Sequence, residues 1–196
     1  MIQAIWDRRS VRRYLDRPVS REQIEAVLRA GTLAPSAKNR QPWQFVVVTG
    51  PSKEELLQAM ERGLARERAE PLLPESARFL QGAAYTAEIL RQAPAVILVL
   101  CPLGLELDRP LTPEERVYEI CNAQSVGAAM ENMSLAATEA GLGSLWICDT
   151  YFAYPELREW LGLEGALFGA LALGYADEMP PARPRKRVED ITVWRT

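Results

Sequence analysis

Arginines are concentrated near both ends of this chain, where they could bind an anion. The segment Arg8–Tyr14 reads RRSVRRY, and the segment 183–187 reads RPRKR. The chain as a whole carries a formal net charge of −3, so these clusters need a local explanation. A guanidinium group binds phosphate with two parallel hydrogen bonds. A solvated charged turn is the commoner explanation of a basic cluster, and the alternative is that the two clusters converge on one phosphate.

A second group of polar side chains lies in the segment Ala34–Trp43, which reads APSAKNRQPW. Pro35 and Pro42 fix φ and push the residues before them out of the helical region. A loop stiffened in this way can hold the side chains of Ser36 and Asn39 in set directions, and rigid loops often carry function. Two interpretations are equally open at this point. One is a ligand site that reads a planar heterocycle, and the other is a sharp helix-to-strand turn with a solvated polar face.

The composition excludes most chemistry that proteins perform with their own side chains. The chain contains no histidine, which removes Ser-His-Asp and Cys-His catalysis and disfavours transition-metal sites. Its cysteines, Cys101, Cys121 and Cys148, form no Cys-x-x-Cys pair and are widely spaced. They therefore indicate reduced thiols, not a disulfide framework or a zinc site. We expect no metal, no catalytic side chain, and a cofactor that carries the reaction.

Other ligand classes are excluded by missing motifs. The segment Gly141–Trp146 begins like a dinucleotide fingerprint, but Trp146 occupies the third glycine position and the segment follows a helix. The net charge gives no reason to expect nucleic-acid binding. The longest strongly apolar strand-like run, residues 95–100, is too short to cross a membrane, and the N-terminus lacks the apolar stretch of a signal peptide. We expect a soluble cytoplasmic protein.

Helix and strand signals alternate along the chain. Capping boxes predict helices that begin at Ser20, Ser52 and Thr112. Further helices are expected near 2–7, before residue 92 and over 154–161. Apolar runs predict strands at 45–48 and 94–100, both buried on two faces, and at 144–148 and 167–175. Residues 70–81 predict a mobile excursion, and the alternation over 188–194 predicts an edge strand. The pattern indicates one α/β or α+β domain over residues 1–196, with a sheet covered by helices.

The helix predicted from Thr112 to Ala140 is long and has small or apolar residues on nearly every side. Such a helix must be buried all round. In a chain of 196 residues, the covering surface can come from a second subunit. The alternative is that it forms the central helix of a monomer.

Three parts of the chain together resemble the nitroreductase family of flavin-dependent oxidoreductases. They are the segment Arg8–Tyr14, the run Ala30–Phe45, and the segment 141–147 followed by 172–175 and 183–185. They cover nearly the whole chain in the family's order, and the second is the most specific. The resemblance implies an α+β fold with a mixed sheet flanked by helices. It also implies an intertwined homodimer with FMN bound at the subunit interface.

The resemblance also implies which residues bind FMN. The residues expected at its phosphate, ribityl chain and ring edge are Arg8, Arg9, Ser10 and Arg12, with Arg183 and Arg185 as a further phosphate contact. The loop that the other subunit lends to the flavin is expected to comprise Pro35, Ser36, Ala37 and Asn39, with Gln41 just beyond it. The residues expected beside the reactive flavin nitrogen are Cys148 and Asp149, where many relatives have glycine. A contact near 85–91 stays unassigned.

The implied activity is an NAD(P)H-dependent reduction of nitroaromatics, quinones or related small oxidants. NADH or NADPH gives hydride to the flavin and leaves, and the oxidant then takes its place in a ping-pong mechanism. Alternatives that share the flavin are a relative that fragments its flavin to dimethylbenzimidazole and a reductive dehalogenase. An alternative of a different class is a flavin-binding protein without turnover. The sequence selects neither the natural acceptor nor the preferred nicotinamide donor.

Overall fold

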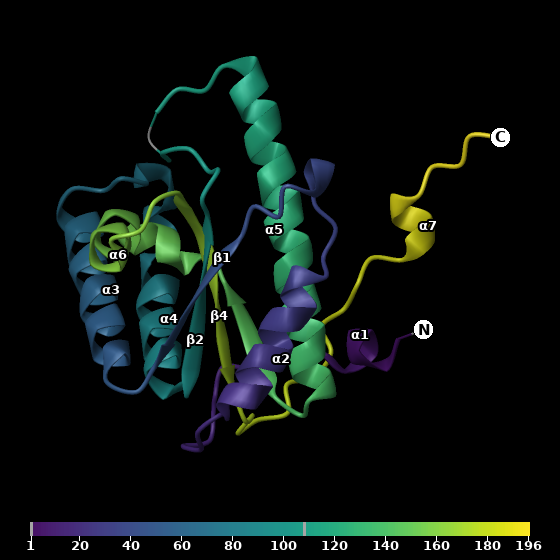
Figure 1. Cartoon of the computed structure of the whole chain (residues 1–196), viewed down its shortest axis with the longest axis horizontal. Helices are drawn as coiled ribbons and strands as arrows, with labels where there is room; N and C mark the ends of the chain where they lie inside the picture. Colours follow the sequence, from purple (N-terminus) through teal and green to yellow (C-terminus); the bar gives the residue numbers. More distant parts are fainter. Residues whose placement is uncertain (1, 108) are drawn as a thin grey trace.

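A four-stranded sheet in the order β1-β2-β4-β3 runs through the middle of the molecule (Figure 1). The computed structural model describes residues 2–107 and 109–196. The strands are β1 (Gln44–Thr49), β2 (Ala95–Cys101), β3 (Gly143–Ile147) and β4 (Ala166–Gly174). Neighbouring strands pair antiparallel. Beyond β3, one parallel bridge joins Ser10 to Ser144, so the sheet as extended by the N-terminal segment is mixed.

Helices cover both faces of this sheet. They are α1 (Gln3–Asp7), α2 (Arg21–Thr32), α3 (Ser52–Ala69), α4 (Leu80–Gln92), α5 (Pro113–Glu139), α6 (Tyr154–Leu161) and α7 (Val188–Ile191). Figure 1 shows α3, α4 and α6 on one face and α2 with α5 on the other. Every residue of β2 is buried, because helices cover both faces of this central strand. A strand covered in this way has apolar side chains pointing in both directions. The expected α+β architecture is confirmed.

Two of the three predicted capping boxes are confirmed. Ser20 with Gln23 and Thr112 with Glu115 exchange the two expected hydrogen bonds at the starts of α2 and α5. The predicted box at Ser52 is wrong, because α3 already includes this residue and no side chain caps the helix. Gly141 adopts φ +72° just after α5, a left-handed conformation that ends a helix at little cost only for glycine.

Two strand predictions need correction. β1 is an edge strand with exposed residues, including Val47 at 38%, so it is not buried on both faces. Its apolar run resembles that of β2, but only one neighbour, β2, pairs with it. The predicted edge strand over 188–194 is also wrong. Its first residues form the short helix α7, and Val193 and Trp194 are more than four-fifths exposed. None of the described strands pairs with this segment.

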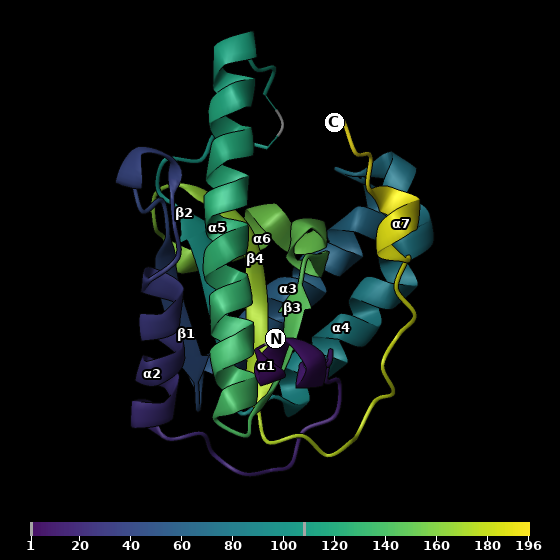
Figure 2. The same ribbon diagram turned by 90° about the vertical axis from the view of Figure 1, so that its right-hand side faces the viewer.

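The first turns of α5 extend beyond the sheet and the other helices (Figure 2). Val117 and Ile120 lie on this part of α5 and are 58% and 52% exposed. The described part of this chain therefore does not bury α5 on all sides, although the sequence predicts a helix buried all round. Farther along, α2 packs so closely against α5 that a Cβ on Gly31 would lie 2.8 Å from Met133. None of the described helices has the length and apolarity needed to cross a membrane.

Candidate functional site

The arginine-rich segment 8–14 lies along the free edge of β3. The Val11 N–H donates to the Ser144 carbonyl at 3.0 Å, which fixes the segment to the sheet. Val11 and Tyr14 are buried, and the Tyr14 hydroxyl donates to the Val11 carbonyl at 2.9 Å. Burial raises the pKa of the Tyr14 phenol, so this inner residue stays neutral. Arg12 and Arg13, which lie between these two buried residues, are half-buried and exposed respectively.

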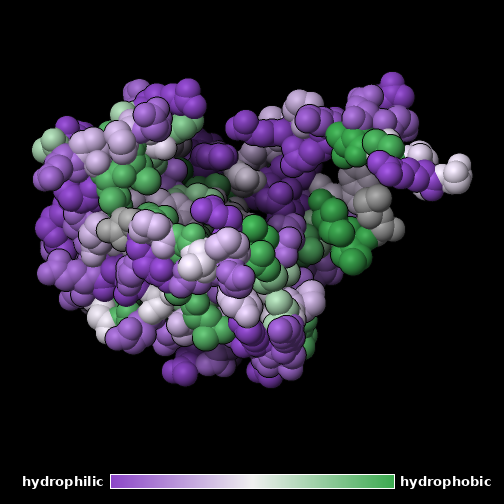
Figure 3. Space-filling model, turned by 90° about the horizontal axis from the view of Figure 1, so that it is seen from above, coloured by the Kyte–Doolittle hydropathy of each residue, from purple (hydrophilic) through white to green (hydrophobic). Residues whose placement is uncertain are grey.

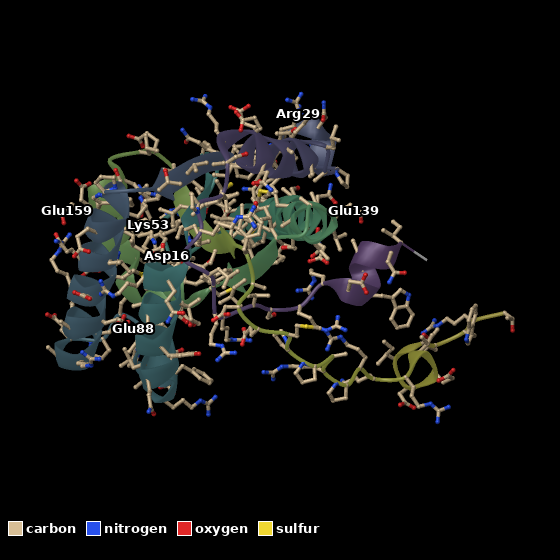
Figure 4. All side chains as sticks on the ribbon, turned by 90° about the horizontal axis from the view of Figure 1, so that it is seen from below. Asp16, Arg29, Lys53, Glu88, Glu139 and Glu159 are labelled. Carbon is tan, nitrogen blue, oxygen red and sulfur yellow. The ribbon has the colours of Figure 1, made fainter. Side chains whose placement is uncertain are left out.

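The segment after β4 runs beside the same residues. The Leu15 N–H donates to the Tyr175 carbonyl and the Asp177 N–H donates to the Arg13 carbonyl, both at 2.9 Å. The chain then passes beneath α1 toward α7 (Figure 4). This route carries residues 180–185 to the arginines of the N-terminal segment.

The two arginine clusters meet around one cavity of about 550 Å³. Its lining includes all six residues expected at the phosphate, ribityl chain and ring edge: Arg8, Arg9, Ser10, Arg12, Arg183 and Arg185. Side chains of α1 and prolines 180, 181 and 184 complete the walls. We call this cavity the arginine pocket.

Most of the positive charge in the arginine pocket is not neutralised by the chain. Among the residues the structure describes, Arg8 is the one pocket arginine within salt-bridge distance of a carboxylate, that of Glu131 at 3.6 Å. Arg12 donates to the Ser10 carbonyl at 3.1 Å, and Arg185 donates to the Arg183 carbonyl at 3.3 Å. These bonds orient the guanidinium groups without cancelling their charge. Such a cavity attracts a compact polyanion, of which a phosphate monoester is the best match.

A smaller cavity of about 240 Å³ adjoins the arginine pocket through Arg12, which lines both. We call it the β3 pocket, because three of its lining residues come from β3. It brings Asp149 together with Thr86 of α4, whose hydroxyl donates to the Asp149 carboxylate at 2.5 Å. Tyr85 and Trp146 also line it, and they are 54% and 40% exposed. Together with Trp6, which lines the arginine pocket, they provide large aromatic surfaces beside the arginines.

Sequence reasoning missed three residues of the β3 pocket. Tyr85 and Thr86 fall in the region where the mid-chain contact stayed unassigned. Trp146 was placed in the predicted strand 144–148 and at a missing glycine position, but no contact with the flavin was assigned to it. Trp146 is the exposed residue within an otherwise buried strand. A large aromatic side chain at an exposed strand position is the signal that could have identified it.

Cys148 is not one of the described residues that line the arginine pocket or the β3 pocket. Cys148 as a whole residue is exposed, and it follows β3 directly. Desolvation raises the pKa of this thiol, and the neighbouring Asp149 carboxylate raises it further. The side chain is therefore protonated at neutral pH, which is unsuited to a cysteine nucleophile.

The loop 35–41 is rigid but lies elsewhere. Lys38, Asn39 and Gln41 all adopt positive φ between 49° and 54°, a conformation that non-glycine residues adopt only when local contacts impose it. The Gln41 N–H donates to the Ser36 hydroxyl at 3.0 Å, and the Ala37 N–H donates to the Ser125 hydroxyl of α5 at 3.2 Å. The loop is therefore attached to α5 on the other side of the sheet.

The structure does not bring the loop to the arginine pocket of its own chain. None of the five loop residues expected at the flavin lines either pocket: Pro35, Ser36, Ala37, Asn39 and Gln41. The six expected residues of the arginine pocket do come together, and Asp149 lies in the adjoining one. A single chain thus presents two separate halves of the expected site.

Comparison with known proteins identifies the family to which this chain belongs. The model of the Nitroreductase family matches residues 5–175. A relative from Archaeoglobus fulgidus, provisionally named an NADH dehydrogenase/NAD(P)H nitroreductase, is 35% identical over 182 residues, which are 89% of this chain and 84% of that protein.

Two solved structures share the fold over nearly their full length. A BluB-like flavoprotein from Clostridium difficile 630 has a TM-score of 0.80 and 27% identity, covering 99% of this chain and 98% of that one. A provisionally assigned nitroreductase from Desulfovibrio desulfuricans, solved in complex with FMN, has a TM-score of 0.70 and 27% identity, covering 99% and 95%. The family match spans most of the chain, and this chain belongs to the nitroreductase family.

Proposed function

We propose that this chain is an FMN-dependent oxidoreductase that uses NADH or NADPH to reduce nitroaromatics, quinones or related small oxidants. The observation that carries the proposal is the convergence of five arginines, from both ends of the chain, on one cavity of about 550 Å³. One arginine cluster could serve a solvated turn, but two clusters brought together around one cavity need a shared anionic ligand. FMN is such a ligand, and the Desulfovibrio relative was solved in complex with it.

The residues present fit FMN. The arginine pocket supplies guanidinium groups for the phosphate, and Ser10 supplies polar atoms for the ribityl chain. The β3 pocket offers Tyr85 and Trp146 as apolar surface beside an isoalloxazine ring. Arg12 lines both cavities, so it can favour negative charge on the ring edge as well as on the phosphate.

When bound, FMN would supply the hydride transfer between the nicotinamide donor and the oxidant. The chain holds and orients the reactants. Its arginines provide a cationic environment, and water can provide protons, so the lack of histidine is no obstacle. The sequence has no dinucleotide fingerprint for a separate nicotinamide site, which supports a ping-pong order in which donor and oxidant use one face in turn.

The complete site needs a second copy of the chain. The loop 35–41, expected at the flavin, lies away from the arginine pocket of its own chain. The projecting turns of α5 expose Val117 and Ile120. The C-terminal arm, which we define as residues 188–196, exposes Val193 and Trp194. Figure 3 shows this arm standing off the body, with hydrophobic residues on it and on the facing surface. A homodimer in which each subunit lends its loop to the partner's FMN would cover these surfaces.

Location is part of the same proposal. The three cysteines are free thiols in the structure, which fits a reducing compartment. We place the enzyme in the cytoplasm, as one FMN-binding domain over residues 1–196.

A second candidate is a flavoprotein that binds FMN without using NAD(P)H. It is favoured by the likeness to the Clostridium protein, which is named only a BluB-like flavoprotein. Titration of the apoprotein with FMN, followed by steady-state assays with each nicotinamide and a quinone or nitroarene, separates the candidates. Turnover supports the oxidoreductase, tight binding without turnover supports the second candidate, and no FMN binding contradicts both.

A further inference from the structure

A carboxylate connects the two segments that build the arginine pocket, namely residues 8–13 and residues 177–185. Glu178 lies on the segment after β4, and its Oε1 accepts hydrogen bonds from the N–H groups of Arg12 at 2.5 Å and Arg13 at 3.3 Å. Its Oε2 lies 3.6 Å from Nε of Arg13. Both backbone bonds are charge-assisted and therefore stronger than neutral ones. No other side chain among the described residues hydrogen-bonds to the Arg12 N–H.

The residues after Glu178 are stiff. Pro180, Pro181 and Pro184 fix φ at three of the six positions between Glu178 and Arg185. A proline-rich segment is extended and semi-rigid, so its direction depends on where it is anchored. The last side-chain anchor before the prolines is Glu178, since Met179 is 98% exposed. The Asp177 N–H also donates to the Arg13 carbonyl at 2.9 Å, and Glu178 adds the attachment nearest to the prolines and to Arg12.

On the basis of the function proposed above, we infer that Glu178 is a positioning residue of the FMN phosphate site. It holds the backbone of Arg12 and the start of the proline-rich segment together, so that arginines from both ends of the chain face one phosphate. It acts through the arginines and does not contact the ligand, since it is absent from the lining of the arginine pocket.

This role predicts that removal of the Glu178 charge weakens FMN binding, whereas charge repulsion alone predicts that it strengthens FMN binding. A carboxylate near a phosphate repels it, so removal of the charge alone would strengthen FMN binding. Loss of the clamp instead lets the two segments separate and weakens FMN binding. Glu178→Gln keeps the size of the side chain and one acceptor oxygen, but it replaces two charge-assisted bonds by weaker neutral ones and removes the ion pair with Arg13. Asp177→Asn removes a neighbouring charge whose side chain makes no hydrogen bond or salt bridge among the described residues.

The experiment uses full-length protein stripped of flavin. It measures the Kd for FMN, the Kd for riboflavin and the Tm of the apoprotein. In E178Q we expect the Kd for FMN to rise about tenfold, while the Kd for riboflavin, which has no phosphate, rises less than about threefold. The D177N control is expected to match the wild type or bind FMN slightly more tightly. Glu178→Asp, which keeps the charge on a shorter arm, is expected to bind FMN with an intermediate Kd.

Two outcomes would overturn the inference. FMN binding in E178Q as tight as in the wild type, or tighter, would reduce Glu178 to a surface charge. An equal loss for FMN and riboflavin, or a collapse of the apoprotein Tm, with no recovery in E178D, would make it a purely structural residue. If the wild type binds neither flavin, the proposed function itself fails, and that result is distinct from both.

Discussion

Arg12 and Arg185 line one cavity, although one lies near the start of the chain and the other near its end. The sheet makes this possible, because the segment 8–14 bonds to β3 and the chain that leaves β4 returns beside it. Neither arginine is within salt-bridge distance of a carboxylate in the described part of the chain. Their charges are therefore available to a phosphate.

Replacement of Arg185 tests this arrangement. Arg185→Ala removes a charge-assisted phosphate contact, whose loss costs about 2 kcal/mol, so we expect the Kd for FMN to rise roughly thirtyfold. The affinity for riboflavin should stay nearly unchanged. Lys186→Ala is the matched control, because Lys186 is the next residue but does not line the pocket. An R185A protein that binds FMN like the wild type would contradict the phosphate assignment.

Association of two chains is tested at the exposed turns of α5. Ile120→Asp places a charge on a side chain that is 52% exposed and that we expect to be buried between subunits. We expect it to shift the protein toward monomer in sedimentation experiments and to weaken FMN binding at the same time. Leu163→Asp, at a 36% exposed residue just after α6, is the control and should remain dimeric. A monomeric I120D protein with normal FMN affinity would refute the shared site.

Packing of α3 against the segment before α6 gives a prediction about stability. A Cβ at Gly63 would lie 2.3 Å from the Cα of Ala153, and a backbone atom cannot move aside easily. We expect Gly63→Ala to lower the free energy of unfolding by about 1–3 kcal/mol. Gly82→Ala on α4 meets no atom within 4 Å and should be neutral or stabilising by up to about 1 kcal/mol. Urea unfolding of both apoproteins measures the difference, and equal stabilities would contradict the close packing.

Alkaline unfolding should depend on Tyr151. Burial raises the pKa of this phenol from 10.0 to about 12, and its hydroxyl donates to the Phe168 carbonyl at 3.3 Å. The unfolded chain therefore ionises first, so the stabilising contribution is complete below pH 10 and is lost as the pH rises from 10 to 12. The free energy of unfolding should fall more steeply over this range in the wild type than in Tyr151→Phe. Identical pH profiles would show that Tyr151 ionises alike in both states.

Features that depend on neighbours in sequence could be predicted. The capping boxes at Ser20 and Thr112 and the helix stop at Gly141 are local, and the structure has each of them. The convergence of the arginine clusters was one of two open interpretations, because it depends on how the segment 8–14 and the segment after β4 come to lie beside each other at the edge of the sheet. Charge alone made it worth considering.

Features that depend on contacts between segments far apart in the chain could not be predicted from the sequence. Thr86 meets Asp149 because α4 lies against the end of β3, and no local pattern in either segment encodes that contact. The alternation over 188–194 suggested a strand, but a strand requires a partner, and none of the described strands lies beside this segment. The loop 35–41 was predicted to be rigid from its prolines, and its side of the sheet became visible only in the structure.

The central claim is that the chain binds FMN and passes electrons from NAD(P)H to a small oxidant. Anaerobic titration of the purified flavin-loaded protein with NADH and with NADPH, followed by a quinone or nitroarene, tests it most directly. We expect the flavin absorbance to bleach with at least one donor and to return on addition of the oxidant. Protein that remains colourless in excess FMN, or a bound flavin that neither donor reduces, would contradict it.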